Sequence, residues 1–214
     1  MAHILITSGP TRQFIDPVRY LTNASSGLMG SSLAEAALAL GHQVTIISGP
    51  VHLEYPAAAE VVPVVTTDEM LAATSARFPH CDGLIGVAAP CDYRPEVVRD
   101  QKISKTGGPL LLQLVETPDV VATMGARKTR QWVVGFALET EDQRFRALAK
   151  LERKSCDLMV LNGPAAMNSA ASAIEILAPD GSVVASHEGD KRMLAERIMA
   201  IVQTRLIEPQ AARI

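Results

Sequence analysis

The sequence predicts an α/β domain with a doubly wound, mostly parallel sheet, helices on both faces and a C-terminal β-hairpin. Along all 214 residues, short apolar runs alternate with segments of helical periodicity, as in repeated strand–helix units. Three runs, at 43–48, 83–88 and 132–137, are almost continuously apolar, which is typical of parallel strands covered on both faces. Aromatic residues make up only 4% of the chain, which favours aliphatic packing of sheet and helices over an aromatic-rich β-sandwich.

The alternation also predicts the order of the elements. Strands are expected at 3–7, 43–48, 60–65, 83–88, 110–115, 132–138, 157–162 and 173–178, with a return strand at 183–187. Helices are expected at 27–41, 67–77, 118–128, 141–154 and 190–207. This succession is that of a Rossmann-like sheet.

Local signals support several of these boundaries. Gly41 is a suitable residue to end the first helix, and Thr67 is a favourable N-cap followed by two acidic residues. Pro118 stands at a helix start, after Thr117. The turn sequence Pro-Asp-Gly-Ser at 179–182 separates two alternating runs and predicts the final hairpin.

Length and composition predict one domain over residues 1–214. A hydrophobic content of 48% is enough for an extended core, and no repeat, low-complexity segment or linker divides the chain. The net charge of −3 argues against nucleic acid as the main partner, because binding to phosphate backbones needs a basic surface.

The cysteines and the hydropathy pattern predict a cytoplasmic protein without a membrane partner. Cys81, Cys91 and Cys156 lie far apart, without metal-ligand spacing, and are expected to be reduced and mostly buried thiols. No apolar run approaches the ~20 residues that span a bilayer. The chain enters its first strand directly, so no leader segment is expected.

Polar and charged residues gather in the loops that follow the predicted strands. Ligands of doubly wound sheets bind beyond the carboxyl ends of the strands. That rule selects the loops 8–26, 49–58, 89–107, 116–118, 139–141 and 163–172.

The first of these loops has the composition of an anion site. Ser25-Ser26-Gly27 opens a helix, where free backbone N–H groups attract negative charge. Gly9 ends the first strand, but the spacing is not GxGxxG, and tight helix–strand packing explains the glycines equally well. Arg19 offers a bidentate fork for a carboxylate or phosphate, and Asn23 both donates and accepts hydrogen bonds.

Asp16 in the same loop has two interpretations, because it either faces a ligand or pairs with Arg12 or Arg19 to brace the loop. In the loop after 83–88, Asp92 is placed to accept hydrogen bonds from a nucleoside or to hold a metal. Lys102 and Lys105 are either phosphate-binding or simply solvated.

A third cluster combines Lys150 and Lys154, four positions apart on a helix, with Glu139 at a strand end. The purely structural explanation for the two lysines is a favourable interaction of their charges with the helix dipole. His42 and His187 have no triad or metal spacing and are expected to be incidental.

These blocks together resemble the phosphopantothenate–cysteine ligase family, the CoaB domain of the bifunctional coenzyme A biosynthesis flavoprotein. The matching blocks are Ile4-Leu5-Ile6-Thr7-Ser8-Gly9-Pro10-Thr11-Arg12, Asp16-Pro17-Val18-Arg19-Tyr20-Leu21-Thr22-Asn23, Ser25-Ser26-Gly27, Ser48-Gly49-Pro50-Val51, Asp92-Tyr93-Arg94-Pro95, Gln101-Lys102-Ile103, Pro118-Asp119, Val134-Gly135-Phe136, Glu139-Thr140 and Lys154 with Asp157-Leu158. They recur in order from residue 4 to about 178, over nearly the whole chain.

The resemblance implies ligation of 4′-phosphopantothenate to L-cysteine through an acyl-nucleotide, an acyl-cytidylate in bacterial members. It implies CTP, or ATP as in animal relatives, as co-substrate with Mg²⁺, no FMN, and a homodimer. Because no decarboxylase domain precedes residue 1, a free-standing ligase is expected.

The resemblance also implies residue roles. Asn23 corresponds to the asparagine that holds the acyl-nucleotide carbonyl, Arg19 to its partner at the substrate, and Lys102 to the lysine that stabilises charge during activation. The positions implied to bind nucleotide are Gly9, Ser26, Gly27, Ala88, Asp92, Pro118, Asp119, Val120, Val121, Phe136, Lys150 and Lys154. No metal ligand is assigned.

Three departures leave alternatives open. Leu28 stands where the family often has Lys, Pro90-Cys91 replaces a small apolar pair, and the 167–170 loop ends in Ala170 without the family's Asp. A degenerate paralogue that binds phosphopantothenate or nucleotide without turnover is therefore an alternative. A nucleotide-cofactor oxidoreductase is disfavoured because the chain lacks GxGxxG and a Tyr-xxx-Lys pair.

Overall fold

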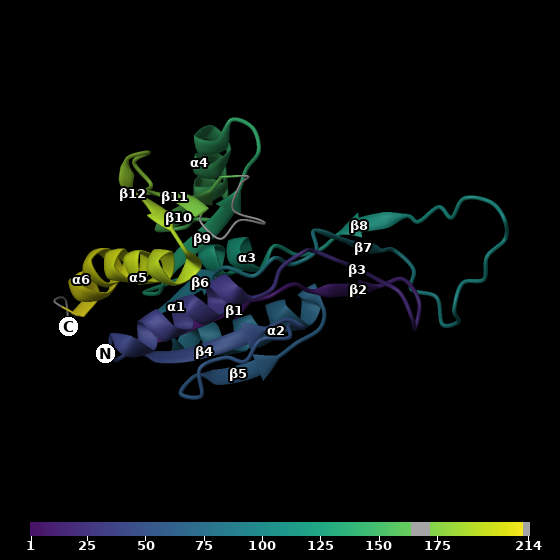
Figure 1. Cartoon of the computed structure of the whole chain (residues 1–214), viewed down its shortest axis with the longest axis horizontal. Coiled ribbons are helices and arrows are strands. Elements are labelled where there is room, and N and C mark those ends of the chain that lie inside the picture. The colour runs from purple at the N-terminus through teal and green to yellow at the C-terminus, as the bar shows by residue number, and fades with distance from the viewer. Residues whose placement is uncertain (164–171, 212–214) are drawn as a thin grey trace.

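A computed structural model describes residues 1–163 and 172–211 and contains the predicted doubly wound sheet (Figure 1). Eight strands lie in the order β12-β11-β10-β9-β6-β1-β4-β5. The strands from β10 to β5 in this order pair in parallel, and β11 and β12 add the antiparallel hairpin. The predicted fold class is confirmed.

The bounds of the elements follow the predicted alternation closely. The strands of the sheet are β1 (His3–Ser8), β4 (Gln43–Ser48), β5 (Glu60–Pro63), β6 (Gly83–Gly86), β9 (Trp132–Leu138), β10 (Leu158–Asn162), β11 (Ser172–Leu177) and β12 (Val183–Gly189). The helices are α1 (Leu28–Ala39), α2 (Thr67–Arg77), η1 (Phe78–His80), α3 (Val120–Arg127), α4 (Gln143–Arg153), α5 (Lys191–Val202), η3 (Gln203–Ile207) and α6 (Glu208–Ala211).

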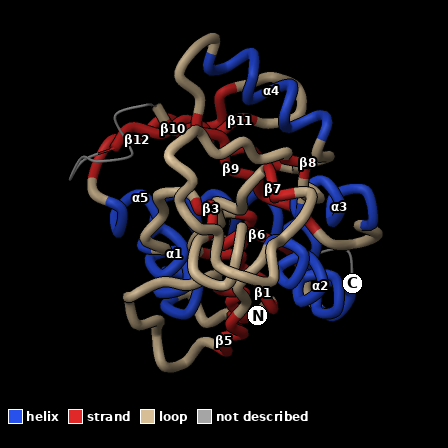
Figure 2. The backbone as a smooth tube through the Cα atoms, turned by 90° about the vertical axis from the view of Figure 1, so that its right-hand side faces the viewer, coloured by secondary structure: helices blue, strands red, loops and turns tan. Residues whose placement is uncertain are grey.

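Helices cover both faces of the sheet, as Figure 2 shows in a view onto the end where the loops gather. Alternate residues of each strand point to opposite faces. Ile4 and Ile6 of β1 therefore pack in the core under α1 and α5, while Leu5 packs in the core under α2, α3 and α4. Burial on both faces explains why the strand sequences are almost continuously apolar.

The chain departs from the prediction at residues 110–115. Instead of a strand of the main sheet, the structure has the short strand β8 (Leu114–Glu116), which pairs with β7 (Tyr93–Pro95). Leu111 is 90% exposed, so the apolar run reflects a projecting surface rather than a core strand. Apolar composition alone does not distinguish these two situations.

A second pair of short strands, β2 (Arg12–Phe14) and β3 (Tyr20–Thr22), forms an unpredicted hairpin within the first loop. The β2–β3 and β7–β8 pairs pack together and project from the carboxyl edge of the sheet, on the right of Figure 1. We call β2, β3, the turn 15–19 between them, β7, β8 and the 96–113 connection the arm.

The last predicted helix, 190–207, changes its winding at residue 202. Regular α-helix ends at Val202, followed by one π-helical turn and the short helix α6. His42 binds this region through Gln203 at 2.9 Å and also accepts from the Ala2 N–H, which gives this histidine, expected to be incidental, a structural role. Among the described residues, no helix has both the length and the apolar character needed to cross a bilayer.

Candidate active site

The first loop closes onto the loop that follows β6, at the base of the arm. The Gly9 carbonyl accepts from the Ala89 N–H at 2.9 Å, which continues the sheet beyond β1. The Asn23 amide donates to the carbonyls of Ala89 at 3.3 Å and Pro90 at 2.9 Å. Gly9 and Asn23 thus both meet the loop that contains Ala88, and the three residues come from the segments that follow β1, β3 and β6.

The turn that opens α1 supports the packing interpretation of its glycines, and its anion site stays a prediction. Gly27 has φ +78°, and a Cβ on Gly30 would lie 2.1 Å from the Ser8 Oγ, so packing requires glycine here. Gly27 provides no side-chain cap and the first helical turn holds no acidic residue. Ser26 Oγ accepts from the Leu28 N–H at 3.4 Å, and Leu28 itself is 47% exposed. The helix dipole at this end favours an anion.

The arm contains the ion pair that the sequence left undecided. Arg12 lies over the Tyr20 ring, 4.6 Å from its centroid, and Asp16 pairs with Arg19. Burial alone would raise the pKa of the Asp16 carboxyl. Hydrogen bonds from the N–H groups of Val18, Ile103 and Arg19 and from the Arg19 side chain outweigh burial and hold this pKa well below its ordinary value. Asp16 is therefore a brace and an anion at neutral pH.

The segment around Lys102 meets Arg19 rather than Asn23. Arg19 donates to the Ile103 carbonyl at 2.6 Å, and the two residues line a pocket of about 370 Å³ formed with 104–110. Asn23 lies at the other end of β3 from Arg19. The four residue steps between these positions span about 13 Å in an extended chain at ~3.3 Å per residue. Lys102 is exposed, with no hydrogen bond or ion pair to any other described residue. The site is thus elongated along the arm instead of forming one compact wall.

A further group of predicted residues surrounds the start of α3 and the end of β9. Lys150 Nζ lies 2.6 Å from Glu139 Oε1, and Lys154 Nζ lies 3.0 Å from Asp119 Oδ2. Asp119 also caps α3 by accepting from the Ala122 N–H at 3.0 Å. Both lysines are therefore held by carboxylates at the edge where the predicted nucleotide positions Pro118, Val120, Val121 and Phe136 lie.

Asp119 makes a pH-dependent contribution to stability. Burial alone would raise the pKa of its carboxyl, but the Ala122 N–H and the Lys154 ammonium outweigh burial and lower the pKa below 3.8. We expect Asp119→Asn, which keeps a cap acceptor and removes the charge, to lower the free energy of unfolding at pH 7 by about 0.5 kcal/mol because the pair is partly exposed.

The sign follows from the lowered pKa. The stabilisation is present above the unfolded-state pKa and is lost as the pH falls through the folded-state value. Urea unfolding of both proteins at pH 7 and at several values below 4 measures this, and the difference should vanish at the lowest pH. A difference that stays constant with pH would contradict the assignment.

Two features of the site have no clear signal in the sequence. Tyr55 hydrogen-bonds to Ser8 at 2.9 Å and to Ser48 at 2.8 Å, which ties the loop after β4 to the carboxyl ends of β1 and β4. Cys91 is buried, its N–H donates to Thr11 Oγ1 at 2.8 Å, and burial raises the pKa of its thiol. All three cysteines are free and buried, as predicted. The predicted departure at Ala170 lies outside the described residues.

No group of three or more His, Cys, Asp or Glu side chains with metal-binding geometry occurs in 1–163 or 172–211. Asp92 remains exposed, and its carbonyl accepts from the Thr117 N–H at 2.9 Å. The exposed Asp92 carboxylate is an oxygen ligand of the type that Mg²⁺ prefers.

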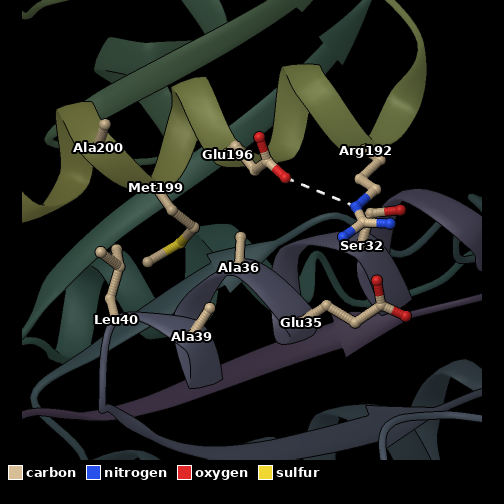
Figure 3. A pocket seen from close by; sticks show the side chains of 9 residues that line it. All are labelled: Ser32, Glu35, Ala36, Ala39, Leu40, Arg192, Glu196, Met199 and Ala200. Atoms are coloured by element: carbon tan, nitrogen blue, oxygen red, sulfur yellow. Dashed lines mark ion pairs between the residues drawn. The ribbon is translucent and has the colours of Figure 1, made fainter.

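A separate pocket of about 210 Å³ lies between α1 and α5 (Figure 3). Ala36 and Met199 lie in its apolar part, and the Arg192–Glu196 ion pair, with N and O 3.5 Å apart, crosses its edge. None of the predicted site residues lines it. This pocket is therefore distinct from the carboxyl-edge site.

The chain is similar to known proteins over almost its full length. The family model described as "DNA/pantothenate metabolism flavoprotein C-terminal domain" matches residues 1–206. The coenzyme A biosynthesis bifunctional protein CoaBC of Vibrio parahaemolyticus is 41% identical over 203 residues, which are 92% of this chain and 51% of the relative. The chain thus spans about half the length of this curated relative.

Solved structures share the fold. The crystal structure of the C-terminal domain of a coenzyme A biosynthesis bifunctional protein CoaBC is 33% identical, covers 97% of this chain and 96% of its own, and has a TM-score of 0.82. A Cab2 H337A mutant in complex with phosphopantothenate-cysteine has a TM-score of 0.83 and covers 99% of this chain and 88% of its own. At 18% identity, the latter supports the fold alone.

Proposed function

Because the chain belongs to the DNA/pantothenate metabolism flavoprotein C-terminal domain family, we propose that it joins 4′-phosphopantothenate to L-cysteine. The observation that carries this proposal is the near-complete mutual coverage with the C-terminal domain of CoaBC at 33% identity. The product, 4′-phosphopantothenoyl-cysteine, is the compound named in the complex of the structural neighbour Cab2.

The proposed reaction has two steps. The phosphopantothenate carboxylate attacks the α-phosphorus of a nucleoside triphosphate, which forms an acyl-nucleotide and releases pyrophosphate. The cysteine amine then attacks the acyl carbon, loses a proton, and displaces the nucleoside monophosphate as the amide bond forms. Activation is needed because a free carboxylate is a poor electrophile, and both steps build negative charge that cations and N–H donors stabilise.

The arm supplies the residues for the acyl group. Arg19 is braced on one edge by Asp16 and remains 42% exposed, so it is available to a carboxylate or a phosphate. Asn23 stands at the base, where its amide is fixed by the carbonyls of Ala89 and Pro90. Lys102 provides an exposed positive charge for the developing pyrophosphate. The elongated arrangement suits a long, flexible substrate.

The main sheet supplies the residues for the nucleotide. The uncapped start of α1 provides backbone N–H groups for phosphate, and Lys150 and Lys154 provide charge beside the start of α3. Mg²⁺, when bound, would neutralise phosphate charge, and Asp92 is the carboxylate that we propose would hold it. We propose CTP as the preferred nucleotide, as in the bacterial members that the chain resembles, with ATP as the alternative.

We also propose a homodimer located in the cytoplasm. The arm exposes apolar side chains that a single copy leaves uncovered, including Val97 at 60%, Leu110 at 54% and Leu111 at 90%. Three buried free thiols agree with a reducing compartment.

Pyrophosphate release tests the function directly. The chain is incubated with phosphopantothenate and either CTP or ATP, and product is then measured after cysteine is added. We expect pyrophosphate with CTP before cysteine is present, and a much smaller rate for Lys102→Gln. Arg99→Gln, a charge removal three positions before Lys102 on the same exposed connection and outside the lining of the pocket at Arg19, is the matched control and should retain turnover.

Two outcomes would contradict the proposal. A folded protein that releases no pyrophosphate with any nucleoside triphosphate is not a ligase of this kind. Binding of nucleotide or phosphopantothenate without turnover would instead support the degenerate paralogue.

A further inference from the structure

A single buried carboxylate connects two segments of the arm that are 87 positions apart in the sequence. Asp16 is 0% exposed, and its Oδ1 accepts from the N–H groups of Val18 and Arg19, both at 2.9 Å. Its Oδ2 accepts from Arg19 Nε at 3.0 Å, from Arg19 Nη2 at 2.5 Å and from the Ile103 N–H at 3.1 Å. Asp16 therefore holds a side chain and a distant backbone group at once.

Ile103 is clamped through both of its peptide groups. Its N–H donates to Asp16, and its carbonyl accepts from Arg19 Nη2 at 2.6 Å. The Arg99 N–H adds a bond of 3.0 Å to the Ile15 carbonyl. Ile103 is also the one residue in 96–113 that is not exposed. The 96–113 connection is thus fastened close to Lys102 and open to solvent on both sides of that point.

The clamp leaves the binding edge of Arg19 free. Asp16 and Ile103 engage Nε and Nη2, and no other described residue bonds to Nη1. The side chain is 42% exposed, so the guanidinium is held on one edge and open on the other. If Asp16 and Arg19 only braced the loop, the Arg19 guanidinium would not need to be exposed on its other edge.

We infer that Asp16 is a positioning residue, which holds Arg19 and the segment that carries Lys102 in one fixed arrangement for the acyl substrate. The inference rests on the proposed function, because it assumes that Arg19 and Lys102 act on the same substrate. Without the clamp, the connection would have to be ordered in each catalytic cycle, at a cost in conformational entropy.

Trypsin cleavage tests the clamp without reference to catalysis. The bond after Lys102 involves the clamped Ile103 N–H, whereas the bond after Lys105 lies beyond the clamp and is an internal reference. In Asp16→Asn, the NH₂ group of the new amide would face the N–H groups of Arg19 and Ile103. Because both sides are then donors, these hydrogen bonds of the clamp would be lost. We expect cleavage after Lys102 to accelerate about tenfold relative to cleavage after Lys105. Equal relative rates in the two proteins would overturn the inference.

Asp68→Asn is the matched control. Asp68 of α2 pairs with Arg94 of β7, which belongs to the arm. Asp68 bonds to neither Arg19 nor Ile103 among the described residues. This variant should leave the ratio of the two cleavages unchanged. If it raises cleavage after Lys102 as strongly as Asp16→Asn does, general loosening of the arm explains the effect and the inference fails.

Steady-state kinetics distinguish positioning from simple bracing. We expect Asp16→Asn to lower kcat on the order of 10- to 100-fold. The KM for nucleotide should change less than twofold, since none of the residues proposed to bind nucleotide lies on the arm. If kcat falls, the KM for nucleotide rises by a similar factor and the Tm is lower, Asp16 serves only stability.

The wild-type protein provides a test that needs no folded variant. Hydrogen exchange should show a protected Ile103 amide beside unprotected amides of Ser104 and Lys105, and rapid exchange at Ile103 would overturn the inference. Failure of the proposed function can be distinguished from failure of this inference. If only the proposed function is wrong, the wild type shows no ligation, while the difference in cleavage and the protection of the Ile103 amide remain.

Discussion

Asn23→Asp should reduce the overall ligation rate by two to three orders of magnitude while leaving nucleotide affinity within a few fold. The Asn23 amide donates to the carbonyls of Ala89 and Pro90. An aspartate presents only acceptors there, so two carbonyl oxygens would face a carboxylate. The negative charge would also lie beside the developing charge of the acyl group, and losing one donor at such a site costs roughly 10²–10³ in kcat.

The measurement combines steady-state ligation with calorimetric titration of CTP. Thr22→Val is the matched control, because the Thr22 hydroxyl donates to the Thr11 carbonyl at 2.8 Å and its loss perturbs the adjacent position of the same strand end. That variant should retain most of the activity. Unchanged turnover in Asn23→Asp would refute the role of this residue.

Gly49→Ala should lower the free energy of unfolding by about 3 kcal/mol, at the upper end of the range for overpacking. A Cβ on Gly49 would lie 1.6 Å from the Pro10 carbonyl oxygen. Both partners are backbone groups next to the sheet, and the Gly49 N–H already donates to the Ser8 carbonyl at 2.9 Å. Relief therefore requires the first loop to move away from the end of β4.

Urea unfolding followed by circular dichroism measures this loss. Gly108→Ala is the matched control, because no atom lies within 4 Å of a Cβ at that position and its φ is not in the left-handed region. We expect that change to alter stability by less than about 0.5 kcal/mol. Wild-type stability of Gly49→Ala would mean that the close approach of the loops is not maintained in solution.

Most of the main sheet could be predicted because its signals are local. The runs at 43–48 and 132–138 are buried on both faces and appear in the structure as β4 and β9 with the same bounds. The turn at 179–182 likewise produced the β11–β12 hairpin. Each of these depends on residues that are neighbours in the chain, so periodicity and turn composition are sufficient to predict them.

The arm could not be predicted in the same way. Residues 110–112 are apolar yet exposed, and β2–β3 is a three-residue pair inside a loop rich in charged and hydroxyl residues. Short strands of this kind are stabilised by packing against another pair, here β2 against β7, rather than by their own pattern. The sequence shows the residue types but not the pairing.

By itself, the sequence determined the doubly wound fold and the family that the motifs resemble, and it predicted the edge of the sheet where ligands are proposed to bind. The tertiary structure decided which of those residues meet. It chose Arg19 over Arg12 as the partner of Asp16, placed Ile103 on the same carboxylate, and paired Lys150 with Glu139. The physical reason is that strand and helix patterns arise from neighbouring residues. A buried charge, in contrast, finds its partners across the fold, because desolvation is offset only where several donors converge.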